Sequence, residues 1–173
     1  KGNDDYMGCF CVSTGFGTRE LADRYEENND MYNSILVKAL ADRLAEAFAE
    51  YLHKQVRTTY WGYAPEEELS NESLILEKYR GIRPAPGYPA CPDHLEKNTI
   101  WELLDVSKSI GVELTESLAM WPAASVSGYY FANPDARYFG LGKITEDQLL
   151  DYIQRRNISI DEATKWLRPN LND

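Results

Sequence analysis

The segment from Arg83 to Pro92 combines a cation, a phenol and four prolines, which makes it a candidate ligand-binding loop. Because proline fixes φ and lacks an N–H, this segment cannot form a helix or a central strand. A stiff loop loses little entropy when it binds a ligand. Arg83 offers a planar fork for a carboxylate, and Tyr88 offers a hydroxyl beside Gly87. An ordinary rigid crossover would have the same composition, so both interpretations stay open.

Cysteine and histidine are too scarce for a metal centre or a catalytic triad. The chain has three Cys and two His. Cys91 and His94 lie three residues apart in the proline-rich loop, whereas the partners in cysteine hydrolases lie far apart in sequence. The dinucleotide, phosphate-loop, G-x-S-x-G and H-E-x-x-H motifs are also absent from the sequence. We therefore expect no bound metal and no catalytic residue.

Two further patterns have both a structural and a functional interpretation. The small residues from Ala123 to Gly128 suit contact with a large flat ligand, but they also suit a loop between strands. Asp42, Glu46 and Glu50 recur every four residues, so they share one helix face. We interpret that face as a solvated acidic surface.

Composition limits the class of protein. The chain has 173 residues, of which 43% are hydrophobic, as expected for one globular domain. Its net charge of −10 argues against nucleic acid as a partner. No apolar run approaches the roughly 20 residues that span a bilayer, so no membrane association is expected. The low, odd cysteine count fits a reducing, cytoplasmic compartment.

The elements that must position these residues follow from periodicity and capping signals. The patterns predict a buried strand over 6–13 and a β-hairpin that pairs 126–131 with 138–144. They also predict helices over 19–28, 31–60, 70–79 and 94–109, and two closing helices with capping boxes at Thr145 and Ser159. In the long helix we expect Leu36, Leu40 and Leu44 on an apolar stripe that Ala41 and Ala45 widen. The alanines between residues 39 and 49 should let another layer approach this helix closely. This order favours an α+β fold in which helices are segregated from an antiparallel sheet.

Several long blocks of the sequence resemble cobalamin-dependent methionine synthase, and specifically its C-terminal reactivation domain. The likeness runs from about residue 5 to the C-terminus. The blocks are Asp42–Glu50, Gly81–His94, Leu114–Gly128 and Trp166–Leu171. The family signature R-x-x-x-G-Y-x-A-C falls on Arg83, Gly87, Tyr88, Ala90 and Cys91.

The resemblance implies a C-shaped single domain over 1–173, with a bent antiparallel sheet flanked by helices and without the N-terminal part of the family's module. It implies that the domain binds S-adenosylmethionine and supports reductive methylation of cob(II)alamin to methylcobalamin. The parent enzyme, a methyltransferase of methionine biosynthesis, methylates homocysteine from methyltetrahydrofolate. The implied S-adenosylmethionine-binding residues are Arg83, Ala85, Gly87, Tyr138 and Phe139. The implied cobalamin-facing residues are Tyr88, Ala119, Ala124 and Ser125.

The partners implied are the cobalamin-binding domain of the same protein and a flavoprotein electron donor, either a flavodoxin or a reductase. Cobalamin would be carried by that other domain, so the chain alone should not turn over. Two alternatives remain: a stand-alone corrinoid-reactivating protein, and a docking module that no longer binds S-adenosylmethionine. An increase in melting temperature with S-adenosylmethionine would distinguish a reactivation domain from a docking module that no longer binds this ligand.

Overall fold

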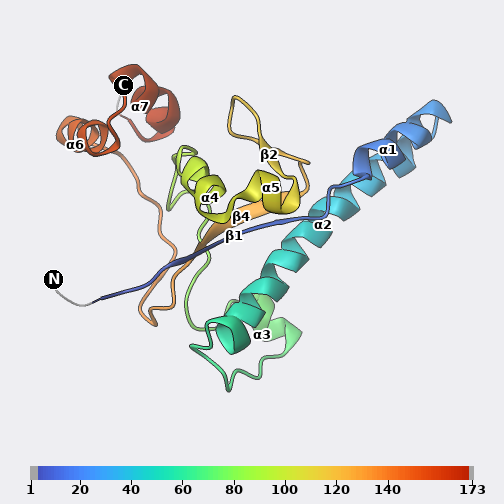
Figure 1. Cartoon of the computed structure of the whole chain (residues 1–173), viewed down its shortest axis with the longest axis horizontal. Helices are drawn as coiled ribbons and strands as arrows, with labels where there is room; N and C mark the ends of the chain where they lie inside the picture. The colour runs from blue at the N-terminus through green and yellow to red at the C-terminus, as the bar shows by residue number, and fades with distance from the viewer. Residues whose placement is uncertain (1–3, 172–173) are drawn as a thin grey trace.

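The structure is a computed structural model, and it describes residues 4–171. The ends of the predicted domain, 1–3 and 172–173, lie outside the described residues. The fold is α+β, as predicted, with two small antiparallel sheets (Figure 1). The strands are β1 (Gly8–Ser13), β2 (Glu113–Leu114), β3 (Met120–Trp121) and β4 (Ser125–Tyr130). The helices are α1 (Thr18–Glu27), α2 (Met31–Gln55), α3 (Asn71–Ile75), α4 (Glu96–Leu104), α5 (Val106–Ile110), α6 (Glu146–Arg156) and α7 (Ile160–Leu167).

The larger sheet pairs β1 with β4, from Gly8 opposite Tyr130 to Ser13 opposite Ser125. The free edge of β4 is occupied by residues 82–84, which arrive from more than 40 positions earlier in the chain. Backbone N–H groups and carbonyls of Ile82 and Phe131 bond each other at 3.0 Å. The predicted hairpin is therefore wrong: residues 138–144 cannot pair with β4, because both of its edges are already taken.

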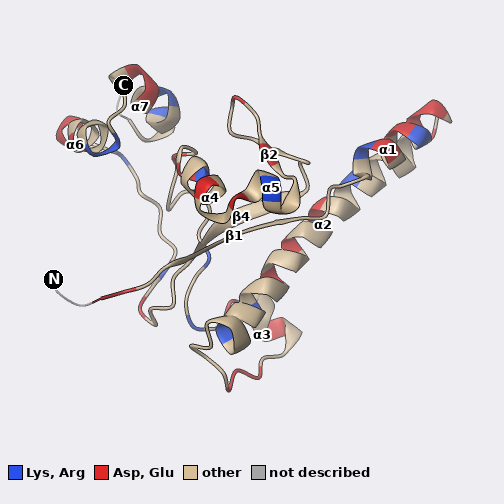
Figure 2. Ribbon diagram, viewed as in Figure 1, with Lys and Arg blue, Asp and Glu red and all other residues tan. Residues whose placement is uncertain are grey.

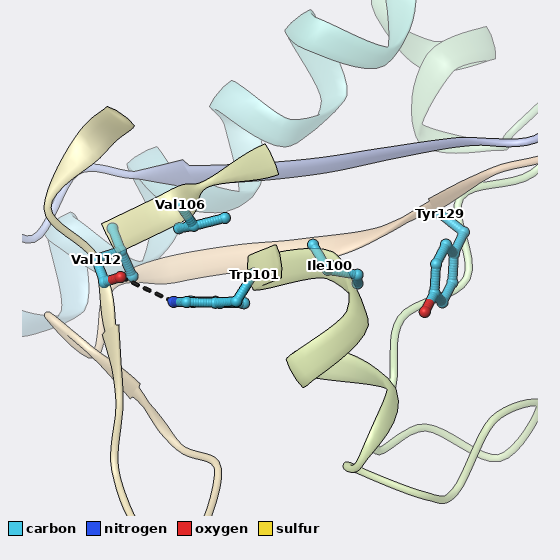
Figure 3. Packing of buried hydrophobic residues seen from close by; sticks show 5 residues of the cluster. All are labelled: Ile100, Trp101, Val106, Val112 and Tyr129. Carbon is cyan, nitrogen blue, oxygen red and sulfur yellow. Dashed lines mark hydrogen bonds between the residues drawn. The ribbon is translucent and has the colours of Figure 1, made fainter. Parts of the chain in front are cut away.

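The two faces of this sheet pack against different helices. Phe10 and Val12 of β1 pack with Ala49 of α2, whereas Cys9 and Cys11 point to the opposite face. On that second face, α4 and α5 contribute to a core in which the Trp101 indole N–H donates to the Val112 carbonyl at 2.9 Å (Figure 3). The alternation of strand side chains thus produces two apolar layers.

Helix α2 crosses the larger sheet (Figure 1), and three of its alanines face that sheet. Ala41, Ala45 and Ala49 are buried, and the Thr14 hydroxyl donates to the Ala41 carbonyl at 2.7 Å. The predicted close approach at the alanines is confirmed, whereas the prediction for Leu36, Leu40 and Leu44 is wrong, since all three leucines are exposed. Small side chains let the sheet approach the helix axis, so the buried face is the alanine face.

Of three predicted helices, the long one reaches residue 60 as expected but changes its hydrogen-bonding pattern, one ends early, and one is divided. The α-helical part of α2 ends at Gln55 and continues as a π-helical turn, η1 (Val56–Tyr60). Helix α3 stops at Ile75, and Glu77 adopts a φ of 51°. The helix expected over 94–109 divides into α4 and α5 because Asp105 adopts a φ of 48°. Residues in this left-handed region end helical hydrogen bonding.

Helices α6 and α7 form a separate apolar cluster with its own buried residues, Leu149, Ala163 and Leu167. The capping box at Thr145 is confirmed, with Gln148 accepting from the Thr145 N–H at 3.0 Å. At Ser159 the N-cap half of the predicted box is present, since its hydroxyl accepts from the Glu162 N–H at 3.1 Å. Figure 1 shows this pair away from α2, joined to β4 by an extended segment. Among residues 4–171, no helix is long and apolar enough to cross a membrane.

Candidate functional site

A cavity of about 620 Å³ lies between α2, the proline-rich loop and the segment after β4. It is lined by five residues that the sequence singled out, namely Arg83, Ala85, Tyr88, Tyr138 and Phe139. The volume falls within the usual range of small-molecule sites. The structure therefore brings together side chains that are up to 56 positions apart in the chain.

The loop that carries Arg83 is fixed by backbone bonds on both sides. The Pro84 carbonyl accepts from the Tyr129 N–H of β4 at 2.9 Å. From the other side, the Tyr138 hydroxyl accepts from the Arg83 N–H at 2.9 Å. Residues 138–141 thus lie across the loop instead of extending the sheet. Because the sheet and the crossing segment both contact the loop, the Arg83 backbone has little freedom.

The Arg83 guanidinium is mostly buried, with a side chain that is 17% exposed. Its Nη1 lies 2.7 Å from Oε2 of Glu50 and donates to the Tyr79 hydroxyl, also at 2.7 Å. The prediction that Asp42, Glu46 and Glu50 form a solvated face therefore fails at Glu50, which is partly buried in an ion pair. Sequence reasoning missed Glu50 and Tyr79 as parts of this site. The four-residue acidic repeat was the available signal.

His53 lies behind Arg83 and is fully buried. Burial, reinforced by the positive charges of Arg57 and Arg83, lowers the pKa of His53 to about 3. The ring is therefore neutral at physiological pH. Its Nδ1 lies 3.4 Å from the Arg83 Nη1, which can only donate, and its Nε2 lies 3.2 Å from the Tyr63 hydroxyl. The proton of the neutral ring consequently belongs on Nε2.

Two carboxylates line the same cavity. Glu46 projects from α2, one turn before Glu50, and Glu77 follows α3. Glu77 is held at a positive φ, an uncommon conformation for a residue with a side chain. Figure 2 shows how acidic residues recur along α2. The cavity thus offers one cation at Arg83 and anionic groups at other points of its wall.

The other predicted binding residues lie outside this lining. The Gly87 N–H donates to the Cys91 carbonyl at 2.7 Å in the turn of the loop. Ala119 is exposed just before β3. Ala124 and Ser125, only 6% and 8% exposed, are buried, and the Ser125 hydroxyl donates to the Pro122 carbonyl at 2.6 Å. The structure therefore does not gather the four residues predicted to face cobalamin into one exposed patch.

Cysteine chemistry finds no support in the geometry. Burial, followed by the nearby negative charges of Asp93 and Glu96, raises the pKa of Cys91 to about 11, so its thiol is protonated at neutral pH. Within residues 4–171, no three His, Cys, Asp or Glu side chains converge as a metal site would require.

This cavity and fold define a member of a known family. The family model described as the activation domain of vitamin B12 dependent methionine synthase matches residues 1–157, and the chain belongs to that family. Among solved structures, the chain is similar to the crystal structure of the MetH reactivation domain bound to AdoHcy. The two share 60% sequence identity with a TM-score of 0.97. The match covers 99% of this chain and 53% of that one, so the chain spans about half the length of that relative.

Proposed function

We propose that this chain binds S-adenosylmethionine in the Arg83 cavity and supports reductive methylation of cob(II)alamin within a methionine synthase. The parent enzyme would methylate homocysteine from methyltetrahydrofolate. The observation that carries the proposal is the convergence of Arg83, Ala85, Tyr138 and Phe139 on one cavity. Family membership and the AdoHcy bound to the similar structure support it, because AdoHcy is what remains when S-adenosylmethionine loses its methyl group.

The charges of the cavity fit the charges of this ligand. S-adenosylmethionine carries one carboxylate, for which Arg83 provides the one remaining edge of its guanidinium, formed by Nη2 and Nε. It also carries a sulfonium and an ammonium group, which are favoured by the negative potential of Glu46 and Glu77. The faces of Tyr138 and Phe139 are suited to a flat base. No general acid or base is needed to transfer a methyl group from a sulfonium, so the residues act by positioning.

Cobalamin would be supplied by another domain of the parent protein and would provide the nucleophilic cobalt. We propose that it meets this chain near Tyr88 and Ala119. Tyr88 is 61% exposed where it lines the ligand cavity, so one side chain can contact both groups. Since Ala124 and Ser125 are buried, their part in this contact would be to shape the backbone around them.

The electron donor would be a flavoprotein, a flavodoxin or a reductase, and the compartment would be the cytoplasm. Arg155 and Arg156 are the basic residues of α6, but they are paired with acidic neighbours. Arg155 lies 2.5 Å from Asp151, and Arg156 lies 2.7 Å from Glu96. An acidic flavodoxin would therefore find little free positive charge at this helix. On its own the chain should bind its ligand without turnover.

Calorimetric titration with S-adenosylmethionine tests the proposal. The variant Arg83→Lys keeps a positive charge for Glu50 but loses the planar fork. We expect it to weaken binding by about 1–2 kcal/mol, within the value of one charge-assisted hydrogen bond. A titration of the unmodified chain without heat or melting-temperature change would reject the proposed function. Normal affinity in Arg83→Lys would place the ligand's carboxylate elsewhere.

A further inference from the structure

A line of alternating charges runs from the interior to the cavity wall. Arg57, whose side chain is fully buried, makes two bonds of 2.7 Å to Glu67. Its Nη1 lies 3.9 Å from Oε1 of Glu50, and the second oxygen of Glu50 lies 2.7 Å from the Arg83 Nη1. Glu50 therefore stands between a deeply buried arginine and the arginine that reaches the cavity.

The acceptors around Arg83 are all on one nitrogen. Glu50, Tyr79 and the unprotonated Nδ1 of His53 lie 2.7, 2.7 and 3.4 Å from Nη1. Because Nη1 has two N–H groups, the two short contacts take them and His53 makes only a long, weak contact. Among residues 4–171, the Nη2 and Nε groups of Arg83 have no hydrogen-bond partner. These two groups form one edge of the planar guanidinium, and a carboxylate binds such an edge with two parallel bonds. The protein thus holds one corner of the fork and leaves a complete edge for a ligand.

We propose that Glu50 is a positioning residue, which fixes the Arg83 guanidinium so that its Nη2–Nε edge receives the carboxylate of S-adenosylmethionine. The inference rests on the proposed function. Arginine has several rotatable bonds, and fixing its orientation before the ligand arrives removes an entropic cost from binding. His53 completes the arrangement as a neutral acceptor, because a protonated ring would repel the guanidinium.

The net charge of the arrangement explains why an acidic residue can hold a group that must bind an anion. Glu50 faces two arginines, Arg57 and Arg83, while Glu67 neutralises the first of them from the other side. Two cations and two anions balance before the ligand arrives. The contact of Glu50 with Arg83 is short, whereas its separation from Arg57 is too long for a hydrogen bond. Orientation of Arg83 is therefore the main effect of Glu50.

The test compares two ligands that differ in the carboxylate. S-adenosylmethionine has it, and 5′-methylthioadenosine is the neutral thioether of the same nucleoside, which lacks the carboxylate, the ammonium group and the sulfonium charge. In Glu50→Ala we expect at least tenfold weaker binding of S-adenosylmethionine and less than twofold change for 5′-methylthioadenosine. Glu50→Gln, which keeps an oxygen acceptor for Nη1, should restore most of the lost affinity. Asp42→Ala, an exposed acidic change on the same helix, is the matched control and should alter neither affinity.

A second variant pair isolates the route through Arg83. In an Arg83→Lys background the further change Glu50→Ala should have less than twofold effect on S-adenosylmethionine, because the planar fork is already lost. If Glu50→Ala fails to fold, Glu50→Asp replaces it, since the shorter side chain withdraws the carboxylate from Nη1. Equal weakening for both ligands would overturn the proposal in favour of general structural support. Tighter binding of S-adenosylmethionine would also overturn it, because Glu50 would then be competing with the ligand for Arg83.

A measurement without ligand separates this inference from the proposed function. In ¹⁵N spectra of the free protein, the Arg83 guanidinium should show hindered rotation that Glu50→Ala releases. If the unmodified chain binds neither ligand, the proposed function fails, and this spectrum alone decides whether Glu50 orients Arg83. Free rotation of the guanidinium in the unmodified protein would overturn the inference.

Discussion

Gly128 lies in β4 directly against the Arg83 loop, and the substitution Gly128→Ala tests how firmly the sheet positions that loop. A methyl group at this position would lie 2.7 Å from the Pro84 carbonyl oxygen and 3.0 Å from Cε1 of Phe10. The first contact is with backbone, so it cannot be relieved by a rotamer change. The loop would have to move away from β4, which also stretches the 2.9 Å bond from the Tyr129 N–H to Pro84.

The expected cost has two parts. Overpacking of a close contact costs about 1–3 kcal/mol, and loss of one backbone hydrogen bond adds about 1 kcal/mol. We therefore expect the free energy of unfolding, measured with urea, to fall by about 2–4 kcal/mol. Because Arg83 is the residue before Pro84, S-adenosylmethionine affinity should fall at least tenfold as well. Gly140→Ala is the control, because an added methyl group there meets nothing within 4 Å. Its free energy of unfolding should change by less than about 0.5 kcal/mol. Unaltered stability and affinity in Gly128→Ala would show that the loop is not held by the sheet.

Three further predictions concern pH, a hydrogen bond and thiol reactivity. The unfolded chain protonates His53 near pH 6.5 but the folded chain only at about pH 3, so stability should fall as pH drops through this window. The free energy of unfolding, measured with urea, should be about 1.4 kcal/mol lower at pH 5.5 than at pH 7.5, and this difference should shrink in His53→Gln. An equal difference in that variant would contradict the assignment of the pH dependence to His53. Tyr138→Phe removes the acceptor of the Arg83 N–H and should lower the free energy of unfolding, measured by thermal denaturation, by about 0.5–1.5 kcal/mol. An unchanged free energy would mean that a water molecule replaces the phenol as acceptor. Burial raises the pKa of Cys11 to about 12 and, with nearby carboxylates, that of Cys91 to about 11. At pH 8 iodoacetamide should therefore alkylate both thiols more than a hundredfold more slowly than free cysteine, as followed by mass spectrometry. Rapid labelling of either thiol would show a more open site.

Local patterns in the sequence predicted the structure correctly where it depends on residues that are neighbours in the chain. The apolar run around Phe10 and Val12 predicted a buried strand over 6–13, and the structure confirms it over Gly8–Ser13, whereas Tyr6 and Met7 are exposed and precede the strand. The caps at Thr145 and Ser159 are likewise local, and both are present. Arg83 was singled out because its loop is stiff and its side chain is chemically suited to a carboxylate.

Contacts between segments that are distant in the chain could not be predicted from local patterns. The hairpin prediction failed because residues 82–84 occupy the edge of β4, and no local signal distinguishes that pairing from a hairpin. The alanines of α2 predicted the close approach of another layer correctly, but the sequence pattern does not show that the neighbouring leucines are exposed. Glu50 was read as solvated because its partner, Arg83, lies 33 positions further along the chain.

The separate apolar cluster of α6 and α7 has a consequence for how the chain unfolds. Few polar contacts tie this helix pair to the remainder: Arg156 lies 2.7 Å from Glu96, and the Tyr152 hydroxyl donates to Asp93. A unit with its own core and a narrow attachment opens independently of the whole, at a lower free energy than global unfolding. Amide hydrogens of α6 and α7 should therefore exchange with solvent before those of β1 and β4. A single melting temperature would then describe neither the α6–α7 pair nor the rest of the molecule correctly.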